Sequence, residues 1–241
     1  MPVNRQSHSP SIEDYIKSIY KITERGEGSV TTTALAGELG VSASSASGML
    51  RKLDERRLVL HTRYGGAELT PEGRKLALDI VRRHRLIESY LARELGYSWD
   101  EVHDEAEVLE HVVSPTLLER MAEKLGQPTS DPHGDPIPAR DGTLTSSDVT
   151  ALSALGPGTT GVIARVSDDD PDLLRYLTTH SIGLGDPIEV VERQPFGGPL
   201  LVRVGAAPHD AVHAFGPGLA QAVSVELVVS GAGDGEREHA E

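Results

Sequence analysis

The sequence predicts a mainly α-helical protein with a C-terminal β domain, and three observations support this fold class. Apolar residues recur at helical spacing through residues 11–125. A segment rich in proline, glycine and serine follows at 126–147. Beyond it the helical period disappears, and short β-branched runs separated by glycine replace it. We therefore expect domains at 1–75, 76–146 and 147–232, followed by a disordered tail at 233–241.

The first domain has the order of a winged helix-turn-helix. Residues 11–24 place isoleucines and tyrosines on one face of a helix. A second, short helix ends at Gly40, and Ser42 can cap a third helix that runs to about Arg57. Two short apolar runs around the pair Gly65-Gly66 then indicate a hairpin. Helix, turn, helix and wing is an arrangement that DNA-binding domains use.

The remaining elements follow from breaks in periodicity. A long helix is predicted over 71–95, with Pro71 in its first turn, where proline is tolerated. Further helices are expected at about 99–112 and 115–125. The C-terminal runs indicate a small all-β barrel that is interrupted by one short helix near residues 170–180.

Composition restricts the class of protein. The chain has no cysteine, so disulfides and thiolate metal sites are excluded. The formal charge is −14, yet residues 1–75 carry 11 basic and 9 acidic side chains, against 12 and 28 in the remainder. The first domain is therefore free to approach phosphates. No apolar run reaches the roughly 18 residues that span a bilayer, so we expect a cytoplasmic protein without a membrane partner.

The third predicted helix is the candidate for reading double-stranded DNA. Its first turns are rich in small hydroxyl side chains, which suit phosphate oxygens and allow close approach to the major groove. The alternative is a small helical domain whose serines are merely exposed to solvent. The predicted DNA-binding residues of this helix and of the wing are Ser42, Ser44, Ser45, Ser47, Arg51, Lys52, Arg63 and Tyr64.

The stretch "HDEAEVLEH" at residues 103–111 concentrates carboxylates and imidazoles beside apolar residues. On a helix of about 100° per residue, four of these polar side chains fall within an arc of about 100°. The opposite side gathers Val108, Leu109 and Val112, which we expect to face a core. A solvated polar face is the ordinary interpretation of such a stripe. The four polar residues are His103, Glu107, Glu110 and His111.

Two further observations favour metal binding over a solvated face. His84 and Glu88 stand four residues apart on a separate helix, and Asp14 lies among apolar residues of the first helix. Buried carboxylates need neutralisation, which a divalent cation provides. Oxygen and nitrogen ligands without sulfur suit Mn²⁺ or Fe²⁺. A metal-dependent hydrolase is a further alternative, although the chain lacks the His-Glu-x-x-His motif.

The stretches "VRRHRL", "VHDEAEVLEHVVS" and "DPHGDPIP" are the most specific features of the sequence. With the winged helix and the β domain, they resemble the diphtheria-toxin-repressor family over residues 11 to about 230, and its manganese-dependent members most. The resemblance implies an SH3-like C-terminal domain and a homodimer that binds palindromic operators when it is loaded with metal. It also implies repression of metal-uptake genes.

The resemblance implies two metal sites. Iron-sensing members carry methionine and cysteine where this chain has Asp14 and Glu107, which favours manganese, with iron as the alternative. A carboxylate and an amide of the β domain complete the second site in the family, and Leu173 stands at the amide position, where Asp172 could substitute. The implied primary ligands are Asp14, Glu107, Glu110 and His111, and the implied second set is His84, Glu88, His103 and Asp170.

Four other expectations concern the metal sites and the dimer. Lys17 stands where shorter, two-domain relatives carry a glutamate of a binuclear site, so we expect separate sites. His133 in the linker is a candidate for an additional ligand, but we expect the commoner case, a surface histidine of a loop. Without metal, we expect the carboxylates of the primary site to repel one another and to release the DNA-reading helices. Apolar residues expected at the dimer face are Leu86, Leu91, Leu95, Leu117 and Leu118, with the structural core as the alternative for each.

Overall fold

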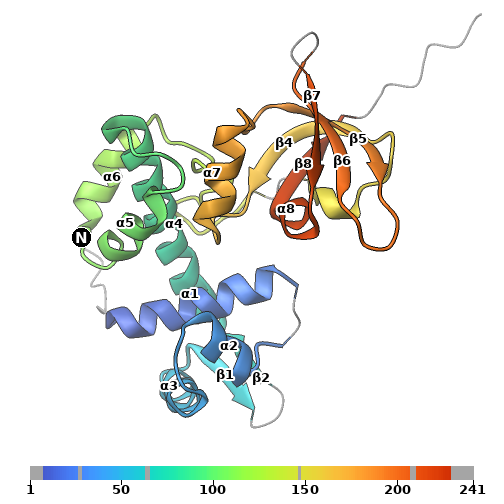
Figure 1. Cartoon of the computed structure of the whole chain (residues 1–241). Coiled ribbons are helices and arrows are strands. Elements are labelled where there is room, and N and C mark those ends of the chain that lie inside the picture. Colours follow the sequence, from blue (N-terminus) through green and yellow to red (C-terminus); the bar gives the residue numbers. More distant parts are fainter. Residues whose placement is uncertain (1–7, 27–28, 63–65, 146–147, 207–209, 229–241) are drawn as a thin grey trace, which may run out of the picture. The chain divides into compact units, whose positions relative to one another are not determined.

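The computed structural model divides the chain into two compact units, Met1–Thr145 and Ser146–Glu241 (Figure 1). It describes residues 8–26, 29–62, 66–145, 148–206 and 210–228. Among these residues, no helix is both long and apolar enough to cross a membrane.

The first unit begins with the predicted winged helix-turn-helix, which is confirmed. The side chains of Thr31 and Ser42 accept hydrogen bonds from the first-turn amides of the second and third helices. The two strands pair antiparallel, with Leu60 opposite Glu68. The elements are α1 (Pro10–Glu24), α2 (Thr32–Glu38), α3 (Ala43–Glu55), β1 (Val59–Thr62) and β2 (Gly66–Leu69).

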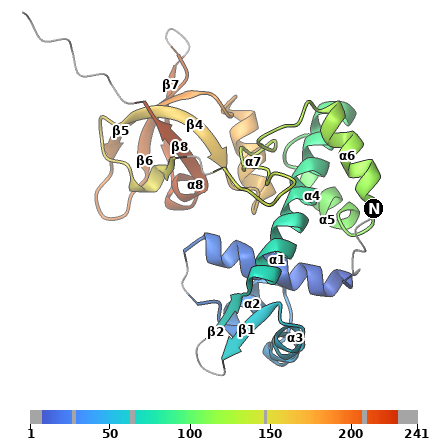
Figure 2. The ribbon, with the colours of Figure 1, turned by 180° about the vertical axis from the view of Figure 1, so that it is seen from behind.

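The long helix α4 (Pro71–Leu95) has the predicted bounds. Thr70 caps its first turn, and Gly96 ends it in a left-handed conformation with φ of 74°. Both views show α4 leading from the β1–β2 hairpin to α5 (Val102–Leu109) and α6 (Pro115–Lys124) (Figures 1 and 2). Helix α5 is shorter than the predicted 99–112 because Glu110 and His111 already belong to the turn that follows it.

Two apolar cores lie along α4. The first joins α4 to the winged helix-turn-helix and the second joins it to α5 and α6, so α4 connects DNA-binding elements to the helices behind them. Members of the first core include Ile12, Ile16, Ile19, Leu35, Leu50, Leu53 and Ile80. Members of the second include Leu86, Ile87, Leu91, Val102, Ala106, Leu118 and Ala122.

The apolar side of the 103–111 stretch does not face a core, contrary to the sequence-based expectation. Val108 and Val112 are 68 % and 74 % exposed, and the core contacts of α5 come from Val102 and Ala106 instead. Leu109 is only partly buried, against the second core. The helical wheel grouped these residues correctly, but one face of a short helix can meet solvent when small residues elsewhere on it make the packing contact.

The second unit is built on an antiparallel sheet with strand order β3-β8-β4-β5-β6-β7, which confirms the β-rich C-terminal domain. The short helix predicted near 170–180 is present as α7, whereas α8 was not predicted. The strands are β3 (Val149–Ala151), β4 (Thr160–Val166), β5 (Pro187–Arg193), β6 (Leu200–Val204), β7 (Ala211–Phe215) and β8 (Val223–Leu227). The helices are η1 (Leu152–Ala154), α7 (Pro171–Thr179) and α8 (Pro217–Ala222).

Candidate metal centre and DNA-binding surface

Helix α1 and the end of α5 bring three predicted ligands together. Nε2 of His111 lies 2.9 Å from Oδ1 of Asp14 and 3.7 Å from Oε1 of Glu110. The ligand atoms of these three residues all lie within 4.8 Å of one another. Burial raises the pKa of Asp14, whose side chain is 39 % exposed, and Glu110 is fully buried.

Glu107, the fourth predicted primary ligand, reaches this group through Lys17. Nζ of Lys17 donates to Oε1 of Glu107 at 2.6 Å and to Oε1 of Glu110 at 2.7 Å. Burial acts to raise the pKa of Glu107, but the charges of Lys17 and His84 outweigh it and leave this pKa below its ordinary value. All four predicted primary ligands therefore belong to one connected cluster of side chains.

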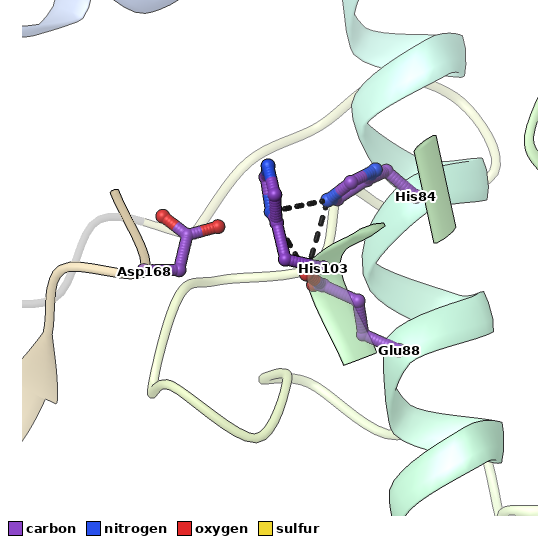
Figure 3. Close-up of side chains that lie close together, drawn as sticks. All are labelled: His84, Glu88, His103 and Asp168. Carbon is purple, nitrogen blue, oxygen red and sulfur yellow. Dashed lines mark hydrogen bonds and ion pairs between the residues drawn. The ribbon is translucent and has the colours of Figure 1, made fainter. Parts of the chain in front are cut away.

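The second predicted group lies between α4 and α5. Figure 3 shows His84 and Glu88 on α4, turned toward His103. Nε2 of His84 lies 3.0 Å from Oε1 of Glu88 and 3.3 Å from Nδ1 of His103. The structure thus assembles the three predicted ligands of the first unit.

The two groups are linked through His84. Its Nδ1 lies 2.6 Å from Oε2 of Glu110, while its Nε2 faces Glu88. Burial acts to lower the pKa of His84, but the carboxylates of Glu88 and Glu110 outweigh it and raise this pKa above its ordinary value. His84 therefore lies between two buried carboxylates that favour its protonated form.

Sequence reasoning missed two residues that hold His111. Nδ1 of His111 lies 2.9 Å from Oε2 of Glu13, and a carboxylate can only accept, so Nδ1 donates and Nε2 is turned toward Asp14. Arg83 donates hydrogen bonds to both carboxylate oxygens of Glu13, at 3.1 and 3.2 Å, and to the backbone carbonyl of Glu110 at 2.7 Å. Both are charged residues that lie one helical turn from a buried isoleucine, Ile16 for Glu13 and Ile80 for Arg83, which was the available signal.

His133 is fully buried, contrary to the expectation of a surface histidine. Its Nε2 donates to the carbonyl of Trp99 at 2.6 Å, so its Nδ1 carries the lone pair. Among the described residues, no group donates a hydrogen bond to that Nδ1. One potential ligand atom from each of His133, Glu88 and Asp131 lies within 4.8 Å of the other two. These residues make a third candidate group, which shares Glu88 with the second.

Asp131 belongs to a buried acidic loop. Its Oδ1 accepts the backbone N–H of both His133 and Asp135 at 2.9 Å, and Arg85 approaches its Oδ2 at 3.5 Å. Burial and the nearby carboxylates of Asp135 and Glu88 raise the pKa of Asp131 well above its ordinary value. A cation would relieve this crowding of negative charge.

Asp170, the predicted ligand from the β domain, belongs to the second unit. Its Oδ1 accepts the backbone N–H of Asp172 at 3.0 Å and caps α7, and Asp172 itself pairs with Arg175. Asp168, which Figure 3 also labels, precedes the same helix. The assignment of Asp170 as a ligand stays a prediction.

The donor set fits a divalent cation. The clusters of the first unit offer carboxylate oxygens and imidazole nitrogens from α1, α4, α5 and the residues after α5, without sulfur. Such ligands suit Mn²⁺ and Fe²⁺. Several of these side chains are buried, and buried like charges at this density require a positive partner.

Helix α3 presents the predicted DNA-binding side chains to solvent. Ser42, Ser44 and Ser45 are exposed, and the hydroxyl of Ser42 is hydrogen-bonded to the hydroxyls of Ser44 and Ser45, each at 2.9 Å. Ser47 is half-buried, and Arg51 and Lys52 are exposed. The wing residues Arg63 and Tyr64 lie outside the described residues. The α3 surface therefore has the exposed hydroxyl and basic groups that phosphate contacts require.

A metal-responsive DNA-binding protein is the class that this fold and this cluster define. Residues 8–67 match the sequence profile described as "Iron dependent repressor, N-terminal DNA binding domain". Residues 70–139 match "Iron dependent repressor, metal binding and dimerisation domain", and residues 150–227 match the FeoA domain. The chain belongs to the diphtheria-toxin-repressor family of metal-dependent transcriptional repressors. The alternative of a metal-dependent hydrolase is therefore wrong.

Relatives include sensors of both metals. A solved structure of a manganese-dependent transcriptional repressor in complex with manganese is 46 % identical and superimposes with a TM-score of 0.86, covering 90 % of this chain and 100 % of that one. The iron-dependent repressor IdeR of Mycobacterium tuberculosis (strain H37Rv) is 32 % identical over 76 % of this chain and 70 % of its own length. The regulator MntR of Bacillus pumilus is 35 % identical over 48 % of this chain and 78 % of its own length.

Proposed function

We propose that this chain is a manganese-activated transcriptional repressor that acts in the cytoplasm as a homodimer on palindromic operators of metal-uptake genes. The single observation that carries the proposal is a contact between the winged helix-turn-helix and the helices that follow it. Asp14, on α1 of the winged helix-turn-helix, lies 2.9 Å from His111, which follows α5. A ligand held by both would couple the DNA-reading elements to the helices behind them.

The residues that would hold the cation are Asp14, Glu107, Glu110 and His111. When bound, the cation supplies positive charge that the three carboxylates share. Asp14 is fixed to the DNA-reading elements because its neighbours Ile12 and Ile16 are buried in the same core as Leu50 of α3. Holding Asp14 against α5 therefore limits how far α3 can turn relative to the dimerisation helices.

This restraint matters for a dimer on a palindrome. Two recognition helices must enter successive major grooves about 34–36 Å apart. When metal tethers α1, the recognition helices of the two subunits are held near this separation before DNA binds. Metal can therefore raise operator affinity without contacting DNA. The coupling free energy expected between the two ligands is typically about 1–3 kcal/mol.

Ligand chemistry supports manganese over iron. Asp14 and Glu107 supply hard oxygen donors at the two positions for which the family resemblance gives methionine and cysteine in iron sensors. The relative at 46 % identity is manganese-dependent, whereas the IdeR relative is 32 % identical. Iron is the second candidate because the family profiles that match residues 8–67 and 70–139 carry its name.

The test measures metal-dependent operator binding. A duplex selected from random DNA in the presence of Mn²⁺ or Fe²⁺ is titrated with the chain, with each metal and with chelator. Glu107→Gln is expected to weaken Mn²⁺-activated binding by about 5–150-fold, because it removes one charged ligand. Glu105→Gln is the matched control, since Glu105 is an exposed carboxylate of the same helix.

Two results would contradict the proposal. Chelated chain that binds the selected duplex as tightly as loaded chain would remove metal activation altogether. Equal activation by Fe²⁺ and Mn²⁺, with no shift in preference for Asp14→Met or Glu107→Cys, would remove the assignment of manganese.

A further inference from the structure

Lys17 is a buried cation within the candidate metal centre. Its side chain is only 6 % exposed, although it belongs to one of the residue types most rarely buried in proteins. Its Nζ lies 2.6 Å from Oε1 of Glu107 and 2.7 Å from Oε1 of Glu110. Glu110 is fully buried, so this ion pair is shielded from water on at least one side.

The oxygen atoms that Lys17 engages are the ones that face the other candidate ligands. Oε1 of Glu110 also lies 3.7 Å from Nε2 of His111. Oε1 of Glu107 lies 3.5 Å from Nε2 of His103 and 3.8 Å from Nδ1 of His84. The ammonium group of Lys17 thus stands against carboxylate oxygens that a divalent cation would need.

We propose that Lys17 is an internal counter-ion that holds Glu107 and Glu110 in place in the metal-free chain and that a divalent cation must displace from these two carboxylates. The proposal rests on the proposed metal site. It assigns to Lys17 a role in setting metal affinity, because the ammonium group and the metal compete for the same oxygen atoms.

Charge balance explains what the competition does. Asp14, Glu107 and Glu110 carry three negative charges, and Lys17 reduces their sum by one, at short distance from two of them. The repulsion expected from the sequence for the metal-free state is therefore partly offset. Metal binding has to break one buried ion pair, with Glu110, and one partly buried ion pair, with Glu107. This cost lowers the metal affinity and raises the metal concentration at which the chain responds.

The test replaces Lys17 by an uncharged side chain of similar length. Lys17→Met is expected to bind Mn²⁺ about 5–150-fold more tightly than wild type by calorimetry, because the competitor is gone. In chelator the same variant is expected to melt about 4 °C or more below wild type, because the buried carboxylate of Glu110 and the partly buried one of Glu107 lose their partner. Lys75→Met, an exposed lysine of α4, is the control and should change neither quantity.

A measurement on the wild-type chain keeps the proposal testable if Lys17→Met fails to fold. Acetylation of lysine amines, followed by mass spectrometry, should find Lys17 protected in chelator relative to Lys75, and Mn²⁺ should increase its labelling. Unchanged labelling of Lys17 on adding Mn²⁺ would overturn the proposal, as would a folded Lys17→Met variant that binds Mn²⁺ no more tightly.

Failure of this inference is distinguishable from failure of the proposed function. If wild-type chain binds operator DNA only with Mn²⁺ but Lys17→Met has unchanged affinity for the metal, the role of Lys17 is wrong and the function stands. If wild-type chain shows no response to Mn²⁺, the function itself is wrong.

Discussion

Two residues that are not candidate ligands support the candidate metal centre: Lys17 pairs with Glu110, and Arg83 pairs with Glu13. Glu107, Glu110 and His111 lie within five positions, so helical spacing alone placed them together. Lys17 and Glu110 are 93 positions apart, and Arg83 and Glu13 are 70 apart. Local periodicity carries no information about such pairs, and only the packing of α1 and α5 against α4 brings them into contact.

Glu13 is predicted to position His111 for metal. Glu13→Gln keeps the shape of the side chain but removes the charge that holds the Nδ1 proton and that pairs with Arg83. Loss of such a supporting carboxylate is expected to weaken Mn²⁺ affinity about 10–100-fold, measured by calorimetry without DNA. Glu24→Gln, a half-exposed carboxylate of the same helix, is the control. A Glu13→Gln chain with wild-type affinity would show that His111 needs no such support.

At the scale of elements, α4 was predicted to the residue because its ends carry strong signals. Pro71 follows the capping Thr70, and Gly96 ends the helix at positive φ. Helix α5 lacks a side-chain cap at its first residue, and its end was overestimated because the polar pattern continues into the turn. The linker was predicted as a loop, but composition gave no warning that its His133 is fully buried.

The loop at residues 131–135 is predicted to bind a second cation against α4. His133 offers a buried imidazole nitrogen without a hydrogen-bond donor among the described residues, near Glu88 and Asp131. The ring of Trp99, the chain's one tryptophan, stacks on His133 with centroids 6.3 Å apart. Binding of paramagnetic Mn²⁺ here should therefore quench tryptophan fluorescence.

His133→Gln is expected to abolish the part of that quenching that follows occupancy of this group, since it removes the nitrogen ligand. His180→Gln, a histidine of the second unit that contacts Tyr176, is the control and should quench as wild type does. Quenching that survives in His133→Gln but disappears in His103→Gln would assign the second cation to His84, Glu88 and His103 instead.

At the scale of the whole molecule, the sequence indicated which residues are apolar but not which of them the chain buries by itself. Leu86, Leu91 and Leu118, three of the five leucines expected at the dimer face, are buried in the second core. Leu95 and Leu117 are 59 % and 48 % exposed. Spacing alone cannot separate these two outcomes, because a residue that packs inside the chain and one that packs against a second copy obey the same helical period.

The exposed apolar residues of α4, α5, the turn after α5 and α6 are predicted to form the homodimer interface. Large apolar side chains left exposed on a dimerising protein mark the surface that a partner covers. Val112→Glu, at the most exposed of these valines, is expected to convert the dimer to monomer in sedimentation experiments, because a buried unpaired charge costs several kcal/mol. Leu60→Glu is the control, since Leu60 is an equally apolar, 61 % exposed residue of the wing and should leave the dimer intact.

A monomeric Val112→Glu chain should also lose Mn²⁺-dependent binding to the palindrome, because the palindrome requires two recognition helices at a fixed separation. It should retain its affinity for the metal, because each primary site is built within one chain. A Val112→Glu chain that stays dimeric would exclude this surface as the interface.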